Sequence, residues 1–303
     1  MTAGGAATTV SAALQDAARR LDAARTDAPR IVAEALLEHV LSLGRAQLLA
    51  RPETPLSLDQ LSRYQALVGR CTSGEPLAYV IGHREFYALD FVVDPRVLIP
   101  RPETELLVET AIRMAGPRLP LSGAGVRPAA QEGGYVIADV GTGSGAIAVA
   151  LAVHLPFVRV VATDISPDAI AVASQNARRH GVTERITFKV GNLLESIEPP
   201  VDLLAANLPY VRTEEWKYLA RPIRDHEPAI ALDGGPDGMH VVSRLLHDAP
   251  GVMRSGGSIL VEIGASQGIA AAELARDSFP DADISVATDH AGLDRLLVVR
   301  TPL

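Results

Sequence analysis

The sequence predicts an α/β protein in which a seven-stranded Rossmann-like domain follows a small all-helical domain and a β-hairpin linker. Three patterns predict this organisation: apolar residues at helical spacing up to about residue 74, a spacing close to two between residues 79 and 99, and alternating strand and helix patterns beyond residue 134. Such alternation is typical of a mostly parallel sheet with helices on both faces. We therefore place the domains at residues 1–76, 77–99 and 100–303.

The first region contains three groups of apolar residues with the spacing of one helix face. They are Leu14, Ala17, Ala18 and Leu21; Ile31, Ala35, Leu36, Val40 and Leu43; and Leu58, Leu61, Tyr64, Leu67 and Val68. Ser57 stands directly before the third group, where an N-cap belongs. In the linker, aromatic and β-branched residues favour strands in Tyr79-Val80-Ile81, Glu85-Phe86-Tyr87 and Phe91-Val92-Val93.

The third region opens with Pro102, which fixes φ at the start of a further helix. Residues 116–134 are rich in Gly, Pro and Ala without an apolar period, which indicates a surface insertion. The predicted strands of the sheet follow, at residues 136–140, 158–163, 186–190, 201–206, 258–263, 284–288 and 295–299. Because the connection between the last two strands is short, we expect them to form an antiparallel pair at the sheet edge.

Composition limits the function classes that remain. The formal net charge of -8 does not suit a protein whose affinity rests on neutralising phosphates, so no direct nucleic-acid partner is expected. Cys71 is the single cysteine, which excludes an internal disulfide, and the eight histidines show no metal-ligand spacing. The first ten residues lack the apolar core of a signal peptide, and no stretch reaches the roughly 18 apolar residues of a membrane span. We expect a cytoplasmic protein.

A glycine-rich loop follows the first predicted strand of the sheet. It reads Asp139-Val140-Gly141-Thr142-Gly143-Ser144-Gly145-Ala146 and runs into a helical pattern. Glycine permits φ > 0 and lets a ligand approach the N–H groups at the helix start. We assign Gly141, Thr142, Gly143, Ser144 and Gly145 to a cofactor site.

Residues at the ends of the next two strands extend this site. Asp164 can accept hydrogen bonds from both hydroxyls of an adenosine ribose, because a carboxylate offers two oxygens. Ile165 follows it. Asn192 and Leu193 end the third strand, where we expect them to flank an adenine.

Two cofactors fit these residues. With Ala146 in place of a third glycine, the loop satisfies the dinucleotide pattern of a nicotinamide enzyme and would hold a pyrophosphate. S-adenosylmethionine would instead present an amino-acid end and a sulfonium. The charge of Asp139 suits an ammonium group and repels a pyrophosphate, which favours S-adenosylmethionine. Asp139 could alternatively bond only the N–H groups of the loop.

The tetrapeptide Asn207-Leu208-Pro209-Tyr210 follows a buried strand at its carboxyl end, where open α/β sheets bind ligands. The Asn207 side-chain oxygen and the Leu208 carbonyl, stiffened by Pro209, can each accept one N–H of a planar NH₂ group. Tyr210 can cover the flat face of that group or lie near a sulfonium. We therefore assign all four residues to binding of the acceptor, with Asn207, Pro209 and Tyr210 as catalytic residues and Asn207 also in contact with the cofactor. A simple strand-end turn is the alternative.

Together these motifs resemble the release factor glutamine methyltransferase family of the HemK type. The resemblance covers nearly the whole chain, including Ile99-Pro100-Arg101-Pro102-Glu103-Thr104-Glu105, Glu227-Pro228, Asp233-Gly234-Gly235-Pro236-Asp237-Gly238 and Glu262-Ile263-Gly264. It implies a seven-stranded S-adenosylmethionine-dependent methyltransferase domain. It also implies methylation of the glutamine side-chain nitrogen in the Gly-Gly-Gln motif of class I peptide chain release factors, which the N-terminal helices help to grip.

The chain departs from the family at one position of the tetrapeptide, where Leu208 replaces the first of two prolines. Because the implied contact uses the carbonyl, we expect the chemistry to be retained. Methyltransferases acting on the N6 amine of adenine in DNA or RNA carry a similar tetrapeptide and form the alternative, as does a cofactor-binding module without activity. The sequence leaves open whether Arg101 and Glu103 contact the substrate. A monomer is expected.

Overall fold

The computed structural model describes residues 8–116 and 134–303, which form two compact units. One unit comprises the chain up to His83 together with Ala220–His226, and the other comprises Arg84–Leu219 and Glu227–Leu303. Apart from its two end residues, the predicted insertion at 116–134 lies outside the described residues.

The first unit is helical, as predicted. It contains α1 (Val10–Ala23), α2 (Pro29–Leu41), α3 (Arg45–Leu49), α4 (Leu58–Thr72), α5 (Leu77–Ile81) and the separate α9 (Arg221–His226). Ser57 is the N-cap of α4, since its hydroxyl accepts the Gln60 N–H at 3.1 Å and its own N–H donates to Gln60 Oε1 at 2.9 Å. The buried side chains of α1, α2 and α4 form one core around Leu21, Leu36 and Tyr64.

The expected strand at Tyr79-Val80-Ile81 is wrong, because these residues belong to α5. A short apolar run fits a buried helix and a strand equally well, and here the flanking residues decide. Pro76 stands at the N-cap, and Gly82 ends the helix with φ of 80° while its N–H donates to Ala78 O.

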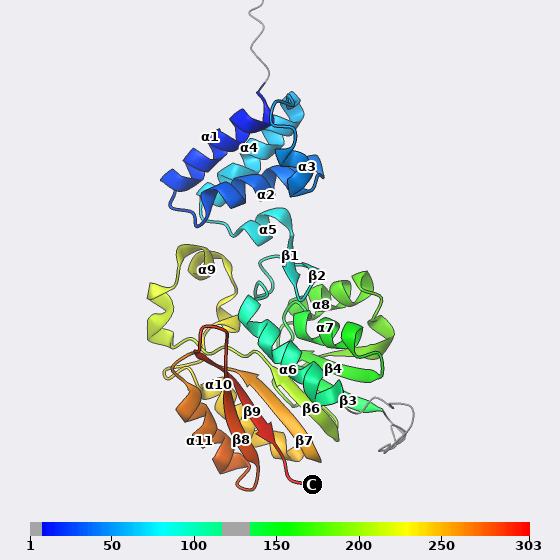
Figure 1. The fold of residues 1–303 in the computed structure, drawn as a ribbon. Coiled ribbons are helices and arrows are strands. Elements are labelled where there is room, and N and C mark those ends of the chain that lie inside the picture. The colour runs from blue at the N-terminus through cyan, green and yellow to red at the C-terminus, as the bar shows by residue number, and fades with distance from the viewer. Residues whose placement is uncertain (1–7, 117–133) are drawn as a thin grey trace, which may run out of the picture. The chain divides into compact units, whose positions relative to one another are not determined.

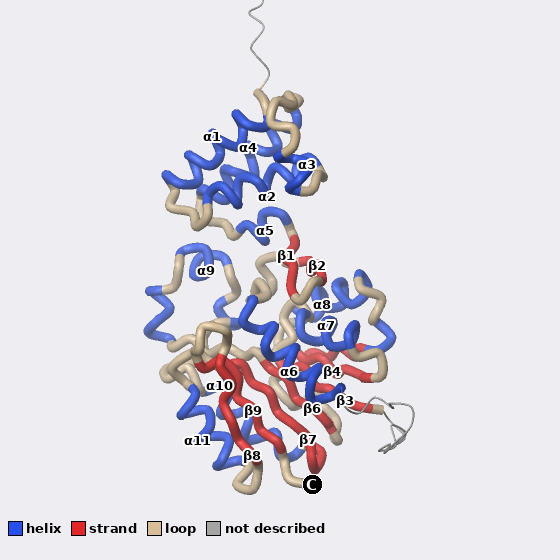
Figure 2. Tube along the Cα trace, viewed as in Figure 1, coloured by secondary structure: helices blue, strands red, loops and turns tan. Residues whose placement is uncertain are grey.

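The β-hairpin is present and consists of β1 (His83–Phe86) and β2 (Leu89–Val92). Its two turn residues, Tyr87 and Ala88, have φ of 50° and 57°. Positive φ at both central residues matches the twist of the flanking strands, although glycine and asparagine are the usual occupants. Figure 2 shows this short pair in red.

The second unit contains a seven-stranded sheet with the order β5-β4-β3-β6-β7-β9-β8. Its strands are β3 (Tyr135–Val140), β4 (Val158–Asp164), β5 (Ile186–Val190), β6 (Val201–Ala206), β7 (Met253–Glu262), β8 (Asp283–Thr288) and β9 (Asp294–Arg300). The first five are parallel, and β9 is antiparallel to both β7 and β8. All seven predicted strands are therefore present, and the antiparallel edge pair is confirmed.

Alternation along the central strands divides the core between the two faces of the sheet. Ile137, Leu203 and Leu260 belong to one core cluster, and their chain neighbours Ala138, Leu204 and Val261 belong to the other. The first face carries α6 (Glu105–Ala115), α7 (Ala146–His154) and α8 (Pro167–Arg179), and the second carries α10 (His240–Asp248) and α11 (Gly268–Ser278). Figure 1 shows these helices on either side of the sheet.

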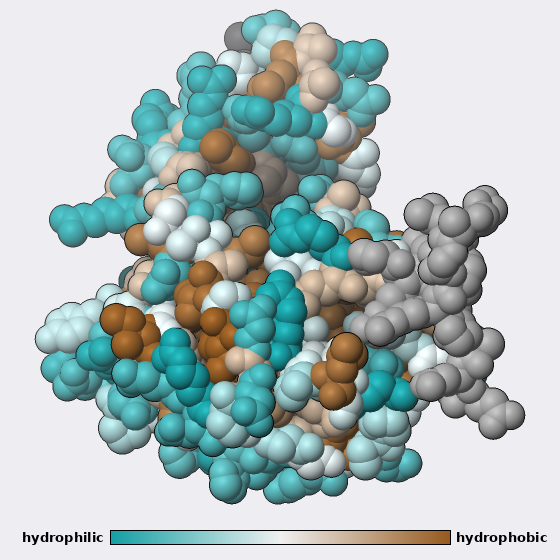
Figure 3. Space-filling view, turned by 60° about the horizontal axis from the view of Figure 1, so that its bottom comes forward, coloured by the Kyte–Doolittle hydropathy of each residue, from teal (hydrophilic) through white to brown (hydrophobic). Residues whose placement is uncertain are grey.

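The face of the molecule in Figure 3 is mainly hydrophilic, with hydrophobic side chains gathered in a few places. Two exposed isoleucines, Ile165 and Ile230, line the cavity described next. Within residues 8–116 and 134–303, no helix combines the length and the apolar character that crossing a bilayer requires.

Candidate active site

A cavity of about 420 Å³ lies in the second unit, and the loops that follow β3, β4, β5 and β6 contribute to its wall. The wall brings together eleven of the residues that the sequence assigns to a site: Gly141, Thr142, Gly143, Ser144, Asp164, Ile165, Asn192, Leu193, Asn207, Leu208 and Pro209. Asp139, Gly145 and Tyr210 are not part of the wall. The carboxyl edge of the sheet thus gathers both predicted sites in one cavity.

The glycine loop turns tightly because three of its residues have positive φ, namely Gly141 at 74°, Gly143 at 54° and Gly145 at 81°. The N–H groups of Gly141 and Thr142 both donate to Thr163 O at 2.9 Å. A Cβ on Gly143 would meet no atom within 4 Å, whereas one on Gly145 would lie 3.0 Å from Ala173 Cβ. Gly143 therefore leaves space beside the cavity, and Gly145 permits close packing of the loop against α8.

Asp139 forms hydrogen bonds with the glycine loop and with the helix that follows it, and its side chain does not face the cavity. Its side chain is 0% exposed, and Oδ2 accepts hydrogen bonds from Thr142 Oγ1 at 2.6 Å and from the Ala148 N–H at 3.1 Å. Burial raises the pKa of the carboxyl to about 7, against the effect of these two bonds. The placement differs from the expected one beside an ammonium group and corresponds to the alternative role of Asp139 in holding the loop.

Asp164 lies at the end of β4, and its two carboxylate oxygens accept hydrogen bonds from two different loops. Oδ2 accepts the Gly143 N–H and Oδ1 accepts the Ser166 N–H, both at 2.9 Å. Burial raises the pKa of this carboxyl, while the backbone hydrogen bonds oppose the shift. Each oxygen keeps a second lone pair, so the carboxylate can still accept the two hydroxyls of a ribose.

Asn192 and Leu193 follow β5 on the same wall. Leu193 has φ of 53°, which is costly for a branched side chain, and its carbonyl accepts a hydrogen bond from Thr163 Oγ1 at 3.1 Å. The bond fixes this turn to the end of β4. Both residues thus lie on the cavity wall, and their contact with an adenine stays a prediction.

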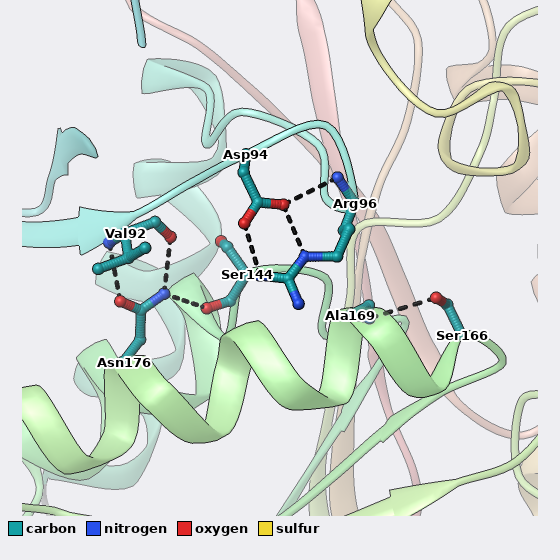
Figure 4. A network of polar contacts seen from close by, with 7 residues as sticks. All are labelled: Val92, Asp94, Arg96, Ser144, Ser166, Ala169 and Asn176. Carbon is teal, nitrogen blue, oxygen red and sulfur yellow. Dashed lines mark hydrogen bonds and ion pairs between the residues drawn. The ribbon is translucent and has the colours of Figure 1, made fainter. Parts of the chain in front are cut away.

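A buried asparagine on α8 ties the glycine loop to the hairpin, as Figure 4 shows. Asn176 Oδ1 accepts the Val92 N–H at 2.8 Å, and Nδ2 donates to Val92 O at 3.0 Å and to Ser144 O at 2.8 Å. Beyond the strand, Asp94 holds the Arg96 guanidinium through hydrogen bonds at 2.9 and 2.6 Å. Arg96 lines the cavity, and the sequence reasoning did not identify it.

Asn207 opens the loop after β6, and its amide has a defined orientation. Nδ2 donates to Thr104 Oγ1 at 3.0 Å, and that hydroxyl donates to Glu262 Oε2 at 2.6 Å. No residue in the described part of the chain donates to Asn207 Oδ1 or to the Leu208 carbonyl. Two acceptors at the cavity wall are therefore available to a ligand.

Pro209 and Tyr210 are held by residues that lie outside the cavity wall. The Tyr210 hydroxyl lies 3.4 Å from Glu262 Oε1 rather than in the cavity wall, and Gln267 Nε2 donates to Tyr210 O at 2.9 Å. A Cβ on Gly234 would lie 2.7 Å from Pro209 O, so only glycine permits this approach. Tyr210 thus supports the loop, in contrast to the predicted position over the acceptor.

Leu208 occupies the position where the family usually has a proline. Its side chain is 4% exposed, and its Cδ2 would lie 3.0 Å from a Cβ on Gly141. The absence of a side chain at Gly141 therefore makes room for the leucine. Packing against the glycine loop supplies some of the rigidity that a proline ring would give.

Sequence reasoning did not assign roles to Thr104 and Glu262, although both belong to motifs that resemble the family. Glu262 is 1% exposed, and burial raises its pKa to about 7 against the effects of the Thr104 hydrogen bond and the charge of Arg295. Arg101 lines the cavity and forms an ion pair with the buried Glu227, whereas Glu103 is exposed. Arg101 is thus braced within the second unit.

Comparisons with known proteins agree with this geometry. A family model described as the PrmC N-terminal domain matches residues 12–82, and one described as a methyltransferase domain matches residues 131–222. The release factor glutamine methyltransferase of Moorella thermoacetica is 43% identical, covering 95% of this chain and 96% of its own. The chain belongs to the release factor glutamine methyltransferase family. The protein of the same name from Koribacter versatilis is 39% identical over 97% and 99% of the two chains.

Membership of this family settles the choice of cofactor. The chain is an S-adenosylmethionine-dependent methyltransferase, and the nicotinamide alternative is set aside. The fold agrees, because a methyltransferase from Pyrococcus furiosus aligns with a TM-score of 0.50 at 16% identity, covering 80% of this chain and all of that one. The open cradle at Gly143 and the Asp164 carboxylate fit the amino-acid end and the ribose of this cofactor.

Proposed function

We propose that this enzyme transfers a methyl group from S-adenosylmethionine to the side-chain amide nitrogen of the glutamine in the Gly-Gly-Gln motif of class I peptide chain release factors. The observation that carries the proposal is the pair of available acceptors, Asn207 Oδ1 and the Leu208 carbonyl, on the wall of the cofactor cavity. A primary amide presents two N–H donors in one plane, and two acceptors fix its direction.

Orientation accounts for most of the expected catalysis. An amide nitrogen is a weak nucleophile, because its lone pair is delocalised into the carbonyl. Holding such a nitrogen in line with a reacting carbon is worth up to roughly 7–11 kcal/mol in favourable systems. S-adenosylmethionine, when bound, supplies a methyl group on a positively charged sulfur. Asn207 and Leu208 accept the N–H groups, so that electron density increases on the nitrogen as it gains the methyl group and loses one of its two protons to solvent.

The remaining residues bind and enclose the reactants. Asp164 offers acceptors for ribose hydroxyls, and the loop at Gly143 leaves room for the amino-acid end. Ile165 and Ile230, 51% and 59% exposed, add apolar surface to a cavity wall that also carries Arg96 and Arg101. Adenine N6 methylation is the weaker candidate because the relatives that match nearly the whole chain are release factor glutamine methyltransferases.

The proposal includes a monomeric enzyme in the cytoplasm. The one cysteine, Cys71, is buried, and burial raises its pKa to about 11, which suits a reducing compartment without a disulfide role.

Incubation with labelled S-adenosylmethionine tests the proposed reaction. We expect label on an intact class I release factor and none on its variant with alanine in place of the motif glutamine. Label that persists on the variant, or that appears only on DNA, would overturn the proposal. Replacement of Asn207 by alanine should lower turnover by about a hundredfold or more but leave a measurable single-turnover rate, and cofactor affinity, measured by calorimetry, should fall far less.

A further inference from the structure

Two hydrogen bonds link the side chains of Asn207, Thr104 and Glu262 in series. Glu262 Oε2 lies 2.6 Å from Thr104 Oγ1, which in turn lies 3.0 Å from Asn207 Nδ2. The three residues come from the 3-10 turn at Pro102–Thr104, from the loop after β6 and from the end of β7. Two of them are almost inaccessible, with Thr104 at 4% and Glu262 at 1% exposure.

The Thr104 hydroxyl determines which group donates and which accepts in each of these hydrogen bonds. A threonine hydroxyl has a single proton, and it donates that proton to the Glu262 carboxylate. Towards Asn207 the hydroxyl can then act only as an acceptor. It therefore accepts from the amide NH₂ and turns the amide oxygen towards the cavity.

The opposite orientation of Asn207 would disable the acceptor site. An amide turned by half a rotation would present its NH₂ group to the NH₂ group of the substrate, and two donors cannot bond each other. Only the Leu208 carbonyl would then remain as an acceptor. Because Thr104 donates to Glu262, it selects the one Asn207 rotamer whose side-chain oxygen can accept a hydrogen bond from a glutamine amide.

Glu262 is itself held in place from several sides. Its other oxygen lies 3.4 Å from the Tyr210 hydroxyl, and the charges that act on it come from Arg295 on β9 and from Glu103 within the 3-10 turn. Its backbone pairs with Leu296 of β9. The carboxyl group is therefore held in a fixed position, and its ionised form can only accept a hydrogen bond from Thr104.

We propose that Thr104 and Glu262 are positioning residues, which act through Asn207 by fixing its side-chain oxygen towards the acceptor amide. This proposal rests on the proposed function, because it assigns the direction of the same acceptor site. Neither residue needs to contact the reacting atoms.

The matched pair Thr104→Val and Thr104→Ser tests the proposal. Valine keeps the shape of threonine but removes the hydroxyl, and serine keeps the hydroxyl. We expect Thr104→Val to lower kcat for release factor methylation by about 10- to 100-fold, which is the range for a misplaced reacting group. Its Kd for S-adenosylmethionine should remain close to that of the wild type, and its melting temperature should fall by only a few degrees, because Glu262 Oε2 and Asn207 Nδ2 lose one hydrogen-bond partner. Thr104→Ser should keep kcat within about threefold of the wild type.

A double variant distinguishes action through Asn207 from a general packing effect. In the Asn207→Ala background, Thr104→Val should cause no further loss in single-turnover rate. Glu262→Leu, which leaves the threonine proton without its acceptor, should lower kcat to a similar degree in the wild-type background. An additive loss in the Thr104→Val and Asn207→Ala double variant, or full kcat in Thr104→Val, would overturn the proposal.

A measurement without the release factor separates this proposal from the proposed function. The side-chain NH₂ signals of Asn207, assigned in ¹⁵N-labelled protein by their loss in Asn207→Ala, should exchange slowly with solvent in the wild type and faster in Thr104→Val. Equal exchange rates in the two proteins would overturn the positioning role even if methylation is observed. Slow exchange without methylation of the release factor would instead refute the assigned substrate.

Discussion

Replacing Gly143 and Gly145 by alanine, one at a time, separates the glycine that leaves room at the cavity from the glycine that packs against α8. Both residues have positive φ, at 54° and 81°. An alanine in the left-handed region costs about 1–2 kcal/mol, and this cost applies to both variants. Only in Gly145→Ala does the new Cβ meet a neighbour, since it would lie 3.0 Å from the Cβ and 3.1 Å from the Cα of Ala173.

The two variants should therefore fail in different assays. Overpacking adds about 1–3 kcal/mol, so Gly145→Ala should lose about 2–5 kcal/mol in free energy of unfolding, and Gly143→Ala only about 1–2 kcal/mol. The Gly143→Ala side chain would take up space at the cavity wall, and we expect its Kd for S-adenosylmethionine to rise by about tenfold or more, which is about 1.4 kcal/mol. Urea unfolding and titration calorimetry measure the two quantities. Equal losses of stability in the two variants would refute the reasoning.

Three further substitutions test residues that hold the loops of the site in place. Gly234→Ala should sharply reduce methylation, because its Cβ would lie 2.7 Å from Pro209 O, whereas Gly251→Ala, with nothing within 4 Å, should be nearly silent in the same assay. Asn176→Ala removes hydrogen bonds to the half-buried Val92 N–H and carbonyl and to the buried Ser144 carbonyl, and should cost about 1–3 kcal/mol in urea unfolding, with a smaller loss counting against this role of Asn176. Burial raises the pKa of Asp139 from the ordinary 3.8 of an aspartate to about 7, so between these two pH values the folded state binds more protons than the unfolded state. This group therefore makes the free energy of unfolding fall with rising pH, by up to about 1.4 kcal/mol per pH unit. Asp139→Asn should remove that slope between pH 5 and 7, and an unchanged slope would contradict the assigned burial.

The sheet could be predicted closely from the sequence because each strand is a short apolar run between turn-forming residues. The run at residues 201–206 is buried at every position, and the predicted and observed bounds are identical. The same rule failed at residues 79–81, where burial on all sides hides the period and only Pro76 and Gly82 mark a helix. The turn at Tyr87 and Ala88 carries none of the usual residues and gave no local signal.

Site residues that directly follow a strand could be predicted from the sequence. Site residues that depend on a contact between segments far apart in the chain could not. Asp164 and Asn207 follow strands directly, and parallel topology brings such ends to one edge. The bond between Thr104 and Glu262 spans 158 positions, and no periodicity encodes it. A buried threonine and glutamate in otherwise helical and strand patterns are the available signal, because buried polar groups need partners.

The chain order of the strands separates the two parts of the site. Gly143 and its partner Asp164 follow β3 and end β4, which are neighbours in the sheet and close in the chain. The acceptor part also uses Glu262 at the end of β7, whose backbone pairs with Leu296 of β9. A substitution in the last strands can therefore disturb the residues that hold the acceptor amide while the loop at Gly143 is left intact.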